Sequence, residues 1–388
     1  MEDPRWVGVG RSNDTDAREA GRRAATAALV GIDTKLVIVF CSDRYDLPAL
    51  LDAINTTTGH APLIGCSTAG EIATGGPEDA SVVVVALGGE GFGAVTASSE
   101  RASEGLRAAG AEVAEAYEGV PRKDHGVLLL LTDGLCGDQQ EIVRGAYGIV
   151  GAGVPLVGGC AGDDLKMRST YQFIGNRVVT DAVVGAALTS DSPMGIGVRH
   201  GWRPVGDPML VTNSSNNRVC TLDDEPALDV YLERLDAPVE ARSDPTAFTR
   251  FALTHPLGLS RRSSEPQVRF VAEADFEGRT LGCIAEVPQG GLTWFMEGDE
   301  GSVLEATDAA CRDALVPLKG TAPLGFLAFD CIARRGVLGD AGIKREIERV
   351  SSHAGDAVVA GFYTYGEIAR TRGLSGFHNQ TLVVLAIS

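Results

Sequence analysis

The sequence contains no uninterrupted apolar run long enough to cross a lipid bilayer. Its long apolar runs, such as GVLLLL at residues 126–131 and SVVVVAL at residues 81–87, fall far short of the roughly 20 residues that a spanning helix needs. The first residues, MEDPRWVGVGRSNDTD, are charged and lack the apolar stretch of a secretory signal. We therefore expect a cytoplasmic protein without membrane insertion.

A block of basic residues is also missing. The chain has 34 Lys and Arg residues against 52 Asp and Glu residues, which gives a formal net charge of -18 at pH 7. Nucleic acids and anionic lipids would repel such a chain. We therefore expect no nucleic acid partner, and small molecules or other proteins remain as partners.

The eight cysteines form no C-x-x-C pair. The sequence therefore indicates neither a zinc ribbon nor a disulfide scaffold. Common enzyme motifs are missing as well: no phosphate-binding G-x-x-x-x-G-K-[ST] and no H-E-x-x-H occurs, and GCSTAG is not the nucleophile elbow G-x-S-x-G. We expect a protein that is not an enzyme.

What the sequence does contain is a turn that occurs twice. GCSTAGEIATG at residues 65–75 and GFYTYGEIART at residues 361–371 share the core T-x-G-E-I. Each copy follows a β-branched run and a helix-like segment, and a third, looser copy is PLVGGCAGDDL at residues 155–165. We interpret these as three repeated strand-helix-strand units with Gly-rich turns, produced by internal duplication.

The residues between the second and third units follow another pattern. Residues 195 to about 318 read as short strands, turns and helices, including FTRFALT at residues 248–254, which has strand character. The sequence therefore predicts an α/β protein in which an α+β module of antiparallel strands and helices is inserted before the third unit.

These motifs resemble the FIST family of bacterial sensory proteins. The resemblance rests on PLIGCSTAGEI (62–72), DEPALDVY (224–231), HPLGL (255–259), GFYTYGEI (361–368) and FHNQTLVVL (377–385), and it extends from about residue 30 to the C-terminus. It implies a FIST N-terminal domain at residues 1–222, with two units, and a FIST C-terminal domain at residues 223–388, with the module and the third unit.

The resemblance also implies a function. FIST modules are regarded as input domains that bind small ligands, amino acids being a common proposal, and they are often fused to kinase, cyclase or chemotaxis output modules. Because no output domain follows the last strand here, a separate signalling protein such as a kinase or cyclase would receive the signal. The NosP proteins, similar in domain content, bind haem through a histidine to sense nitric oxide, which makes haem a possible cofactor.

The candidate ligand-binding residues lie in the three turns, because ligands collect beyond the carboxyl ends of strands in α/β sheets. Glu71, Asp163 and Glu367 take the same place in each turn and could hold an ammonium group. They could equally cap the backbone of their own turns. The remaining candidates are Cys66, Ser67, Thr68, Asp133, Cys160, Thr364, Tyr365, His378 and Asn379.

Each of these has an ordinary alternative. The hydroxyls suit a ligand carboxylate but also stabilise turns, and His378 and Asn379 could simply fix the turn of Glu367. Cys66 and Cys160, one residue apart in repeat register, would serve a cysteine-dependent enzyme only if their thiols were exposed and acidic. Buried, inert thiols are the other interpretation.

His255 is the candidate iron ligand if haem is bound. It precedes a Pro-Leu-Gly turn, and aromatic residues in the same region could supply an apolar wall. The alternative is a half-buried histidine bonded to a backbone carbonyl.

Overall fold

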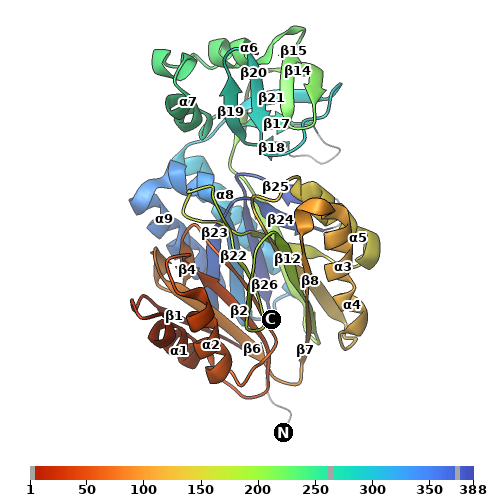
Figure 1. Ribbon diagram of the computed structural model, residues 1–388, viewed down its shortest axis with the longest axis vertical. Helices are drawn as coiled ribbons and strands as arrows, with labels where there is room; N and C mark the ends of the chain where they lie inside the picture. The colour runs from red at the N-terminus through yellow and green to blue at the C-terminus, as the bar shows by residue number, and fades with distance from the viewer. Residues whose placement is uncertain (1–4, 261–265, 372–375) are drawn as a thin grey trace.

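The computed structural model describes residues 5–260, 266–371 and 376–388. Figure 1 shows a body of β-sheets and helices with a smaller module above it. The protein is a mixed α/β structure, as the sequence predicts. No helix among the described residues is both long and apolar enough to pass through a membrane.

The first sheet of the body has the strand order β1-β6-β2-β3-β10-β11. Helix α1 leads from β1 to β2, and helix α2 connects the parallel strands β2 and β3. The bounds are β1 (Trp6–Ser12), α1 (Ala17–Ala28), β2 (Thr34–Cys41), α2 (Leu47–Thr57), β3 (Leu63–Ser67), β6 (Val82–Gly88), β10 (Gln172–Ile174) and β11 (Arg177–Val179).

The second sheet has the order β7-β12-β8-β9-β24-β25. Its parallel pair, β8 and β9, is connected by α5. The bounds are β7 (Phe92–Glu100), η1 (Ala102–Glu104), α3 (Leu106–Ala114), α4 (Ala116–Gly119), β8 (His125–Thr132), α5 (Gln139–Val150), β9 (Leu156–Cys160), β12 (Ala182–Ser190), β24 (Glu367–Arg370) and β25 (Phe377–His378).

The third sheet has the order β13-β26-β22-β23-β4-β5. Its parallel pair, β22 and β23, is connected by α9. The bounds are β4 (Glu71–Ala73), β5 (Gly76–Glu78), β13 (Met194–Arg199), α8 (Glu300–Leu315), η3 (Val316–Leu318), β22 (Gly325–Cys331), α9 (Ile332–Ala354), β23 (Val358–Thr364) and β26 (Leu382–Ile387).

The three sheets thus share one strand plan, and each ends in a hairpin that comes from elsewhere in the chain. The β4–β5 hairpin follows β3 in sequence but pairs with β23. The β10–β11 hairpin follows β9 but pairs with β3, and β24–β25 follows β23 but pairs with β9. Each unit therefore completes the sheet of another unit, in a closed cycle of three.

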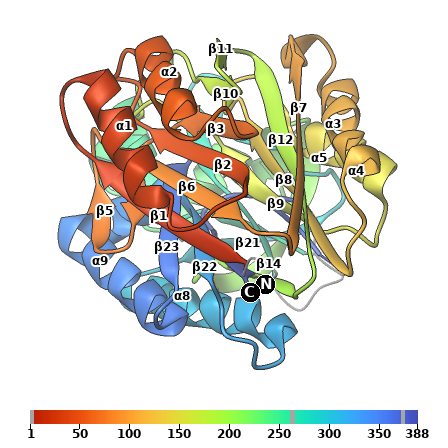
Figure 2. The same cartoon turned by 90° about the horizontal axis from the view of Figure 1, so that it is seen from below.

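The inner faces of the sheets enclose one apolar core. The rings of Phe40 and Phe362, from the first and third sheets, lie 4.7 Å apart between centroids, and Phe329 packs edge-on against both. Figure 2 shows the helices on three outer sides of the body: α1 with α2, α3 to α5, and α8 with α9. Burying both faces of the central strands explains their continuous apolar runs.

The helices begin where the sequence places short acidic residues. The side chains of Asp16, Asp46 and Asp138 accept hydrogen bonds from backbone N–H groups in the first turns of α1, α2 and α5. Asp299 and Ser302 form a reciprocal capping box at α8. Such caps satisfy N–H groups that have no partner within the helix.

Glycines on the first strand of two units let a helix backbone come close. A Cβ at Gly8 or Gly10 would lie about 2 Å from a carbonyl oxygen of α1, and one at Gly195 or Gly197 equally close to a carbonyl oxygen of α8. Only glycine permits this approach. The G-x-G spacing at both places therefore serves helix packing.

The α+β module is smaller than the sequence suggests. Its sheet has the order β18-β17-β21-β14-β15-β20-β19, with β16 beside β15. The bounds are β14 (Arg203–Ser215), β15 (Arg218–Leu222), β16 (Glu225–Pro226), α6 (Ala227–Arg234), η2 (Val239–Arg242), α7 (Pro245–Ala252), β17 (Leu257–Leu259), β18 (Gln267–Arg269), β19 (Val271–Asp275), β20 (Thr280–Cys283) and β21 (Leu292–Glu297).

Two predictions about this region are wrong. The module is inserted inside the third unit, between β13 and α8, because β13 pairs with β26 and α8 packs on both strands. Residues 248–254 are largely helical, in α7, because Asp244 caps a helix that Pro245 begins. The side chain of Phe248 is fully buried in the module core beneath that helix.

Candidate functional site

The three Gly-rich turns meet at one point of the body. The backbone N–H of Gly162 donates to the carbonyl of Ser67 (3.0 Å), and Tyr363 N–H donates to the carbonyl of Gly70 (2.9 Å). Cys160 N–H donates to the carbonyl of Gly366 (2.8 Å). Each turn therefore bonds to the other two, as the hairpin exchange requires. We call residues 65–72, 158–164 and 361–368 the turn junction.

Two buried glutamates close this junction. Glu71 accepts from the hydroxyl of Thr68 with one oxygen, and from the N–H (3.0 Å) and hydroxyl (2.8 Å) of Ser81 with the other. Burial raises the pKa of Glu71 to about 7, although these hydrogen bonds act to lower it. The carboxylate is therefore engaged with its own turn and with the start of β6.

Glu367 repeats this arrangement in the third unit. It accepts from the hydroxyl of Thr364 (2.5 Å) with one oxygen, and from the N–H (3.0 Å) and hydroxyl (2.8 Å) of Thr381 with the other. Burial again raises the pKa to about 7. Neither glutamate is exposed to solvent, so the capping interpretation describes both.

Asp163 does not occupy the place of the two glutamates, and this part of the prediction is wrong by one residue. Strand pairing sets Ser67 against Cys41 and Cys160 against Thr132. Glu71 lies four residues beyond Ser67, whereas the residue four beyond Cys160 is Asp164. The residues in the places of Thr68 and Ser81 are Ala161 and Ala182, so the second unit lacks the hydroxyls that would hold a carboxylate.

Asp163 instead anchors its own loop to the third turn. It accepts hydrogen bonds from the Tyr365 hydroxyl and from the backbone N–H groups of residues 167–169. Burial acts to raise its pKa, but these hydrogen bonds outweigh burial and leave the pKa below the usual value. The Tyr365 hydroxyl also accepts from the N–H groups of Asp163 (3.2 Å) and Leu165 (2.7 Å).

Asp133 and Ser67 are also engaged within the protein. Asp133 accepts from Leu135 N–H (2.8 Å), Asp181 N–H (2.9 Å) and the Thr170 hydroxyl (2.7 Å). The Ser67 hydroxyl donates to the Gly162 carbonyl (2.8 Å). These contacts hold the turns together, as ordinary turn stabilisation would.

The thiols of Cys66 and Cys160 are buried, and they lie one place apart in repeat register, as predicted. Burial is the main cause that raises the pKa of each thiol well above its ordinary value. A thiol nucleophile needs a lowered pKa and exposure. The geometry therefore favours the interpretation of inert thiols.

His378 and Asn379 face the turn of Glu367, as predicted. His378 pairs with Glu367 across the β24–β25 hairpin, and its Nε2 lies 3.0 Å from the Ala369 carbonyl oxygen. Asn379 is buried beside Gly366, and neither polar atom of its side chain meets a partner among the described residues. The use of Asn379 in ligand binding stays a prediction.

The surroundings of His255 do not fit a haem. Its ring stacks on Phe251 with 4.2 Å between centroids, and its Nδ1 lies 2.8 Å from the Phe251 carbonyl oxygen. Phe248, expected to form an apolar wall, packs on Tyr231 inside the module core. The Phe248 ring is thus packed into the module core, and Nδ1 of the histidine is held by a backbone carbonyl.

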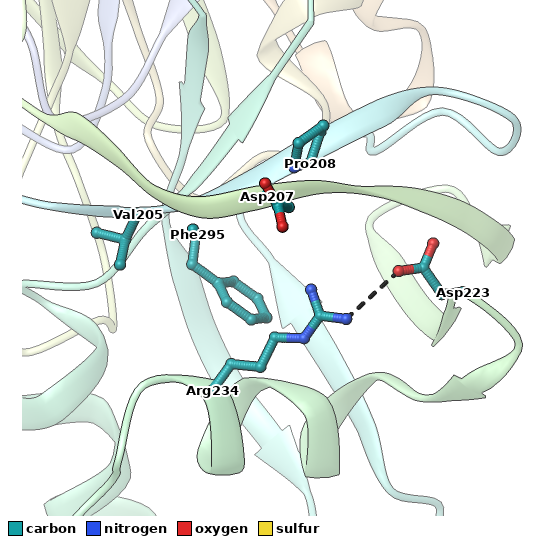
Figure 3. A pocket seen from close by; sticks show the side chains of 7 residues that line it. Val205, Asp207, Pro208, Asp223, Arg234 and Phe295 are labelled. Atoms are coloured by element: carbon teal, nitrogen blue, oxygen red, sulfur yellow. Dashed lines mark ion pairs between the residues drawn. The ribbon is translucent and has the colours of Figure 1, made fainter.

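A pocket that sequence reasoning missed lies in the module (Figure 3). It has a volume of about 470 Å³ and forms where β14 bulges away from β21 between Val205 and Met209. We call it the bulge pocket. Its lining residues are Val205, Gly206, Asp207, Pro208, Asp223, Arg234 and Phe295. None of them belongs to the turn junction.

The bulge pocket combines charges of both signs with an apolar wall. Arg234, from the last turn of α6, reaches toward Asp223 at an N–O distance of 3.5 Å, and both side chains are nearly half exposed. Figure 3 shows the Phe295 ring beside Arg234, with Asp207 on the strand opposite. The Gly-Asp-Pro sequence at residues 206–208 is the signal that could have revealed the bulge.

Sequence relatives of the whole chain have been found in bacteria. An uncharacterized protein of Mycobacterium tuberculosis is 25% identical over 386 residues, and one of Mycobacterium bovis is 27% identical over 391 residues. Each match covers 97% of both chains. Among solved structures, a cyanuric acid hydrolase from A. caulinodans is 10% identical and covers 49% of this chain and 72% of that chain, but its TM-score of 0.29 supports no shared fold.

The profile of the FIST N domain matches residues 35–225, and that of the FIST C domain matches residues 227–370. Together they span most of the chain, including both copies of the T-x-G-E-I core. The chain therefore belongs to the FIST family, whose domains are sensory domains of signal transduction.

Proposed function

We propose that this chain is a cytoplasmic input protein that binds a free amino acid or a similar zwitterionic metabolite in the bulge pocket. The observation that carries the proposal is the meeting of Arg234, Asp207 and Asp223 with an apolar wall in one hollow of about 470 Å³. A site of that size with a few converging polar groups suits a small ligand.

The charges match the two ends of an amino acid. The Arg234 guanidinium can take the carboxylate through two parallel hydrogen bonds, and the two aspartates can take the ammonium group. Val205 and Phe295 offer contacts to an apolar side chain. The existing pair of Arg234 and Asp223 is long and exposed, so it contributes little and a ligand can replace it.

Ligand binding in the bulge pocket can affect the body because β14, which lines the pocket, is joined to the body at its first residue. β14 begins at Arg203, directly after Trp202, whose indole N–H donates to the Gln380 carbonyl of the body (3.0 Å). Gln380 in turn donates to the Leu253 carbonyl of the module (2.8 Å). A ligand that prefers one placement of the module shifts the population toward it. A separate signalling protein, such as a kinase or cyclase, would bind the altered surface.

The test is calorimetric titration with a panel of L-amino acids, with Arg234→Gln as the site variant. Arg218→Gln is the matched control, since Arg218 pairs with Glu273 and Asp275 in the same module and does not line the pocket. We expect one amino acid or a few to bind the wild type and the control but not Arg234→Gln. The corresponding amine without the carboxylate should lose binding as well.

Two results would contradict the proposal. Binding that survives Arg234→Gln but is lost in Glu71→Gln or Glu367→Gln would place the ligand at the turn junction. A panel without any binding amino acid would reject this ligand class. At about 100 times its dissociation constant, a true ligand should add roughly 2.7 kcal/mol to the free energy of unfolding, which a thermal shift detects independently.

A further inference from the structure

A buried ionic cluster lies between helices α8 and α9 at the end of β22. Arg334 donates from Nε to Asp330 Oδ1 (2.7 Å) and from Nη2 to Glu346 Oε1 (2.5 Å). All three side chains are completely buried. Thr307 of α8 donates to the same Glu346 oxygen (2.6 Å). The cluster thus joins both helices to the strand.

Its charges do not balance if both acids are ionised. One guanidinium faces two carboxylates, which would leave a negative charge without compensation in a site closed to water, at a cost of several kcal/mol. The remaining oxygens, Asp330 Oδ2 and Glu346 Oε2, meet no hydrogen-bond donor among the described residues. Each carboxyl group therefore has one satisfied oxygen and one without a partner.

One proton can satisfy both of these oxygens. The two carboxyl groups are brought together by the one guanidinium that both of them bind. Burial, the charge of Glu346 and a hydrogen bond with Glu346 raise the pKa of Asp330 well above its usual value, against the opposing charge of Arg334. Like charges in close contact cannot both ionise readily. A proton on one acid donates to the other and makes the cluster neutral.

We propose that Asp330 and Glu346 share a single proton between Oδ2 and Oε2, and that this proton-bridged pair fixes Arg334 on the backbone carbonyl of His200, at the entry to the module. The link is direct, because Arg334 Nη1 donates to the His200 carbonyl (2.9 Å). His200 lies between β13 of the body and β14 of the module. The pair therefore connects proton binding to the placement of the linker.

The kink in α9 gives this connection a moving part. Gly339 has a non-helical backbone (φ 61°, ψ 179°) and separates Arg334 from Glu346. Loss of the proton leaves both Asp330, before the kink, and Glu346, after it, negatively charged. Their repulsion favours opening of the kink, which draws Arg334 from the linker.

Other ionisable groups surround the pair, and none of them supplies a second buried cation to it. Arg335 pairs with Asp79 at the surface, and burial lowers the pKa of His200 to about 4, which keeps that ring neutral. The groups that face the cluster are Tyr363 of β23, Glu367 of β24 and Cys311 of α8. His378 of β25 and Arg199 of β13 act on the neighbouring His200.

The test uses amides, because an amide N–H can stand in place of the shared proton. Asp330→Asn and Glu346→Gln should each leave a neutral cluster and fold with wild-type stability near neutral pH. The double variant should unfold much more readily, since it leaves Arg334 without a counter-ion. Urea unfolding from acid to alkaline pH should show the wild type losing stability relative to either single variant, by up to tenfold in the unfolding constant per pH unit.

Two further measurements remain informative if the double variant fails to fold. The infrared carbonyl band of a protonated acid should persist in the wild type at about pH 9, above the titration of Glu71 and Glu367, and vanish in Asp330→Asn.

The second measurement is hydrogen exchange at residues 200–203, which form the linker to the module. Its rate, corrected for the intrinsic rate, should rise with pH in the wild type only. The free energy of unfolding could instead have the same pH slope in the wild type and the single variants, or depend on Na⁺ or K⁺ in the wild type. Either result would contradict the proposal of a shared proton. Exchange at residues 200–203 that does not change with pH would contradict the proposed link between the pair and the module.

Discussion

Glu71 and Glu367, at opposite ends of the chain, are held by the same set of partners: a threonine three residues before each, and a hydroxyl with its own N–H at the start of a later strand. Each glutamate opens a hairpin that crosses into the sheet of another unit. Each carboxylate thus bonds the first residue of the hairpin to the residue just before the next long strand of its own unit, which is β6 for Glu71 and β26 for Glu367. The repeated turn is therefore the point where hairpin exchange is fixed.

The titration of these two glutamates should make stability depend on pH. Burial raises both pKa values to about 7, above that of an exposed glutamate, about 4.3. A raised folded-state pKa means that the stabilisation is complete below the unfolded value and is lost as pH rises toward 7. Each group should reduce the free energy of unfolding by up to about 1.4 kcal/mol per pH unit in that window.

Urea unfolding between about pH 4 and pH 8 can measure this slope in the wild type, Glu71→Gln and Glu367→Gln. Each glutamine cannot ionise, so each variant should show a shallower decline than the wild type. Glu78→Gln, a partly exposed acid paired with Arg11, serves as the control and should keep the wild-type slope. Parallel curves for all four proteins would contradict the assignment.

The bond between Tyr365 and Asp163 should hold the second and third turns together. Tyr365→Phe removes one hydroxyl that donates to the Asp163 carboxylate and accepts from two backbone N–H groups. Leaving such groups unpaired costs about 1–3 kcal/mol each, so we expect the two N–H groups together to lower the free energy of unfolding by about 2 kcal/mol or more. Tyr171→Phe, at a half-buried tyrosine, is the control. A loss of stability no larger than in the control would show that the junction does not depend on this bond.

The sequence predicted the elements of the turn junction but not the way they are connected. The β-branched runs, the T-x-G-E-I turns and the residues Thr68, Thr364, Glu71 and Glu367 are local signals, and the structure brings them together. Which sheet receives each hairpin is not a local property, because β4, β10 and β24 carry only three or four residues that could pair with any of the three sheets. The one-residue error at Asp163 has the same origin, since strand register decides the alignment.

The module shows a second limit of sequence reasoning. The pattern of residues 195–199 predicts a strand but does not say whether that strand belongs to the module or to the body. Only its pairing with β26 assigns it to the body. The bulge pocket depends on Arg234 and Phe295, which are far apart in the chain and carry no motif. Long-range packing brings these two residues together, and hydrophobic periodicity in the sequence does not predict such packing.

A glycine in the repeated motif should be required for packing between neighbouring strands. A Cβ at Gly361 would lie 1.8 Å from the Ala328 carbonyl oxygen, whereas one at Gly153 would meet nothing within 4 Å. Gly361→Ala should therefore cost about 1–3 kcal/mol or more, as overpacking does. Gly153→Ala should change the free energy of unfolding by less than about 0.5 kcal/mol. Thermal and urea unfolding compare the two, and similar values would contradict the packing argument.

Haem binding through His255 should not occur in the folded protein. Nδ1 of the imidazole is held by a backbone carbonyl, and Phe248, which could have formed an apolar wall, is packed inside the module core. Titration with hemin should give no Soret shift that differs between the wild type and His255→Ala, with the exposed His60→Ala as control. A shift lost only in His255→Ala would restore the haem hypothesis.

Thiol reactivity should follow exposure and leave the turn cysteines unmodified. Cys136 and Cys220 are partly exposed, whereas Cys66 and Cys160 are buried and burial raises the pKa of both thiols. Because the thiolate is the reactive form, a maleimide at neutral pH should label Cys220 of the native protein first and then Cys136, because burial raises the pKa of Cys136 to about 11. Peptide mass spectrometry gives the order, and labelling of all eight in urea is the control. Rapid labelling of Cys66 or Cys160 in the native protein would instead support a cysteine-dependent enzyme, because only an activated thiol reacts from such a site.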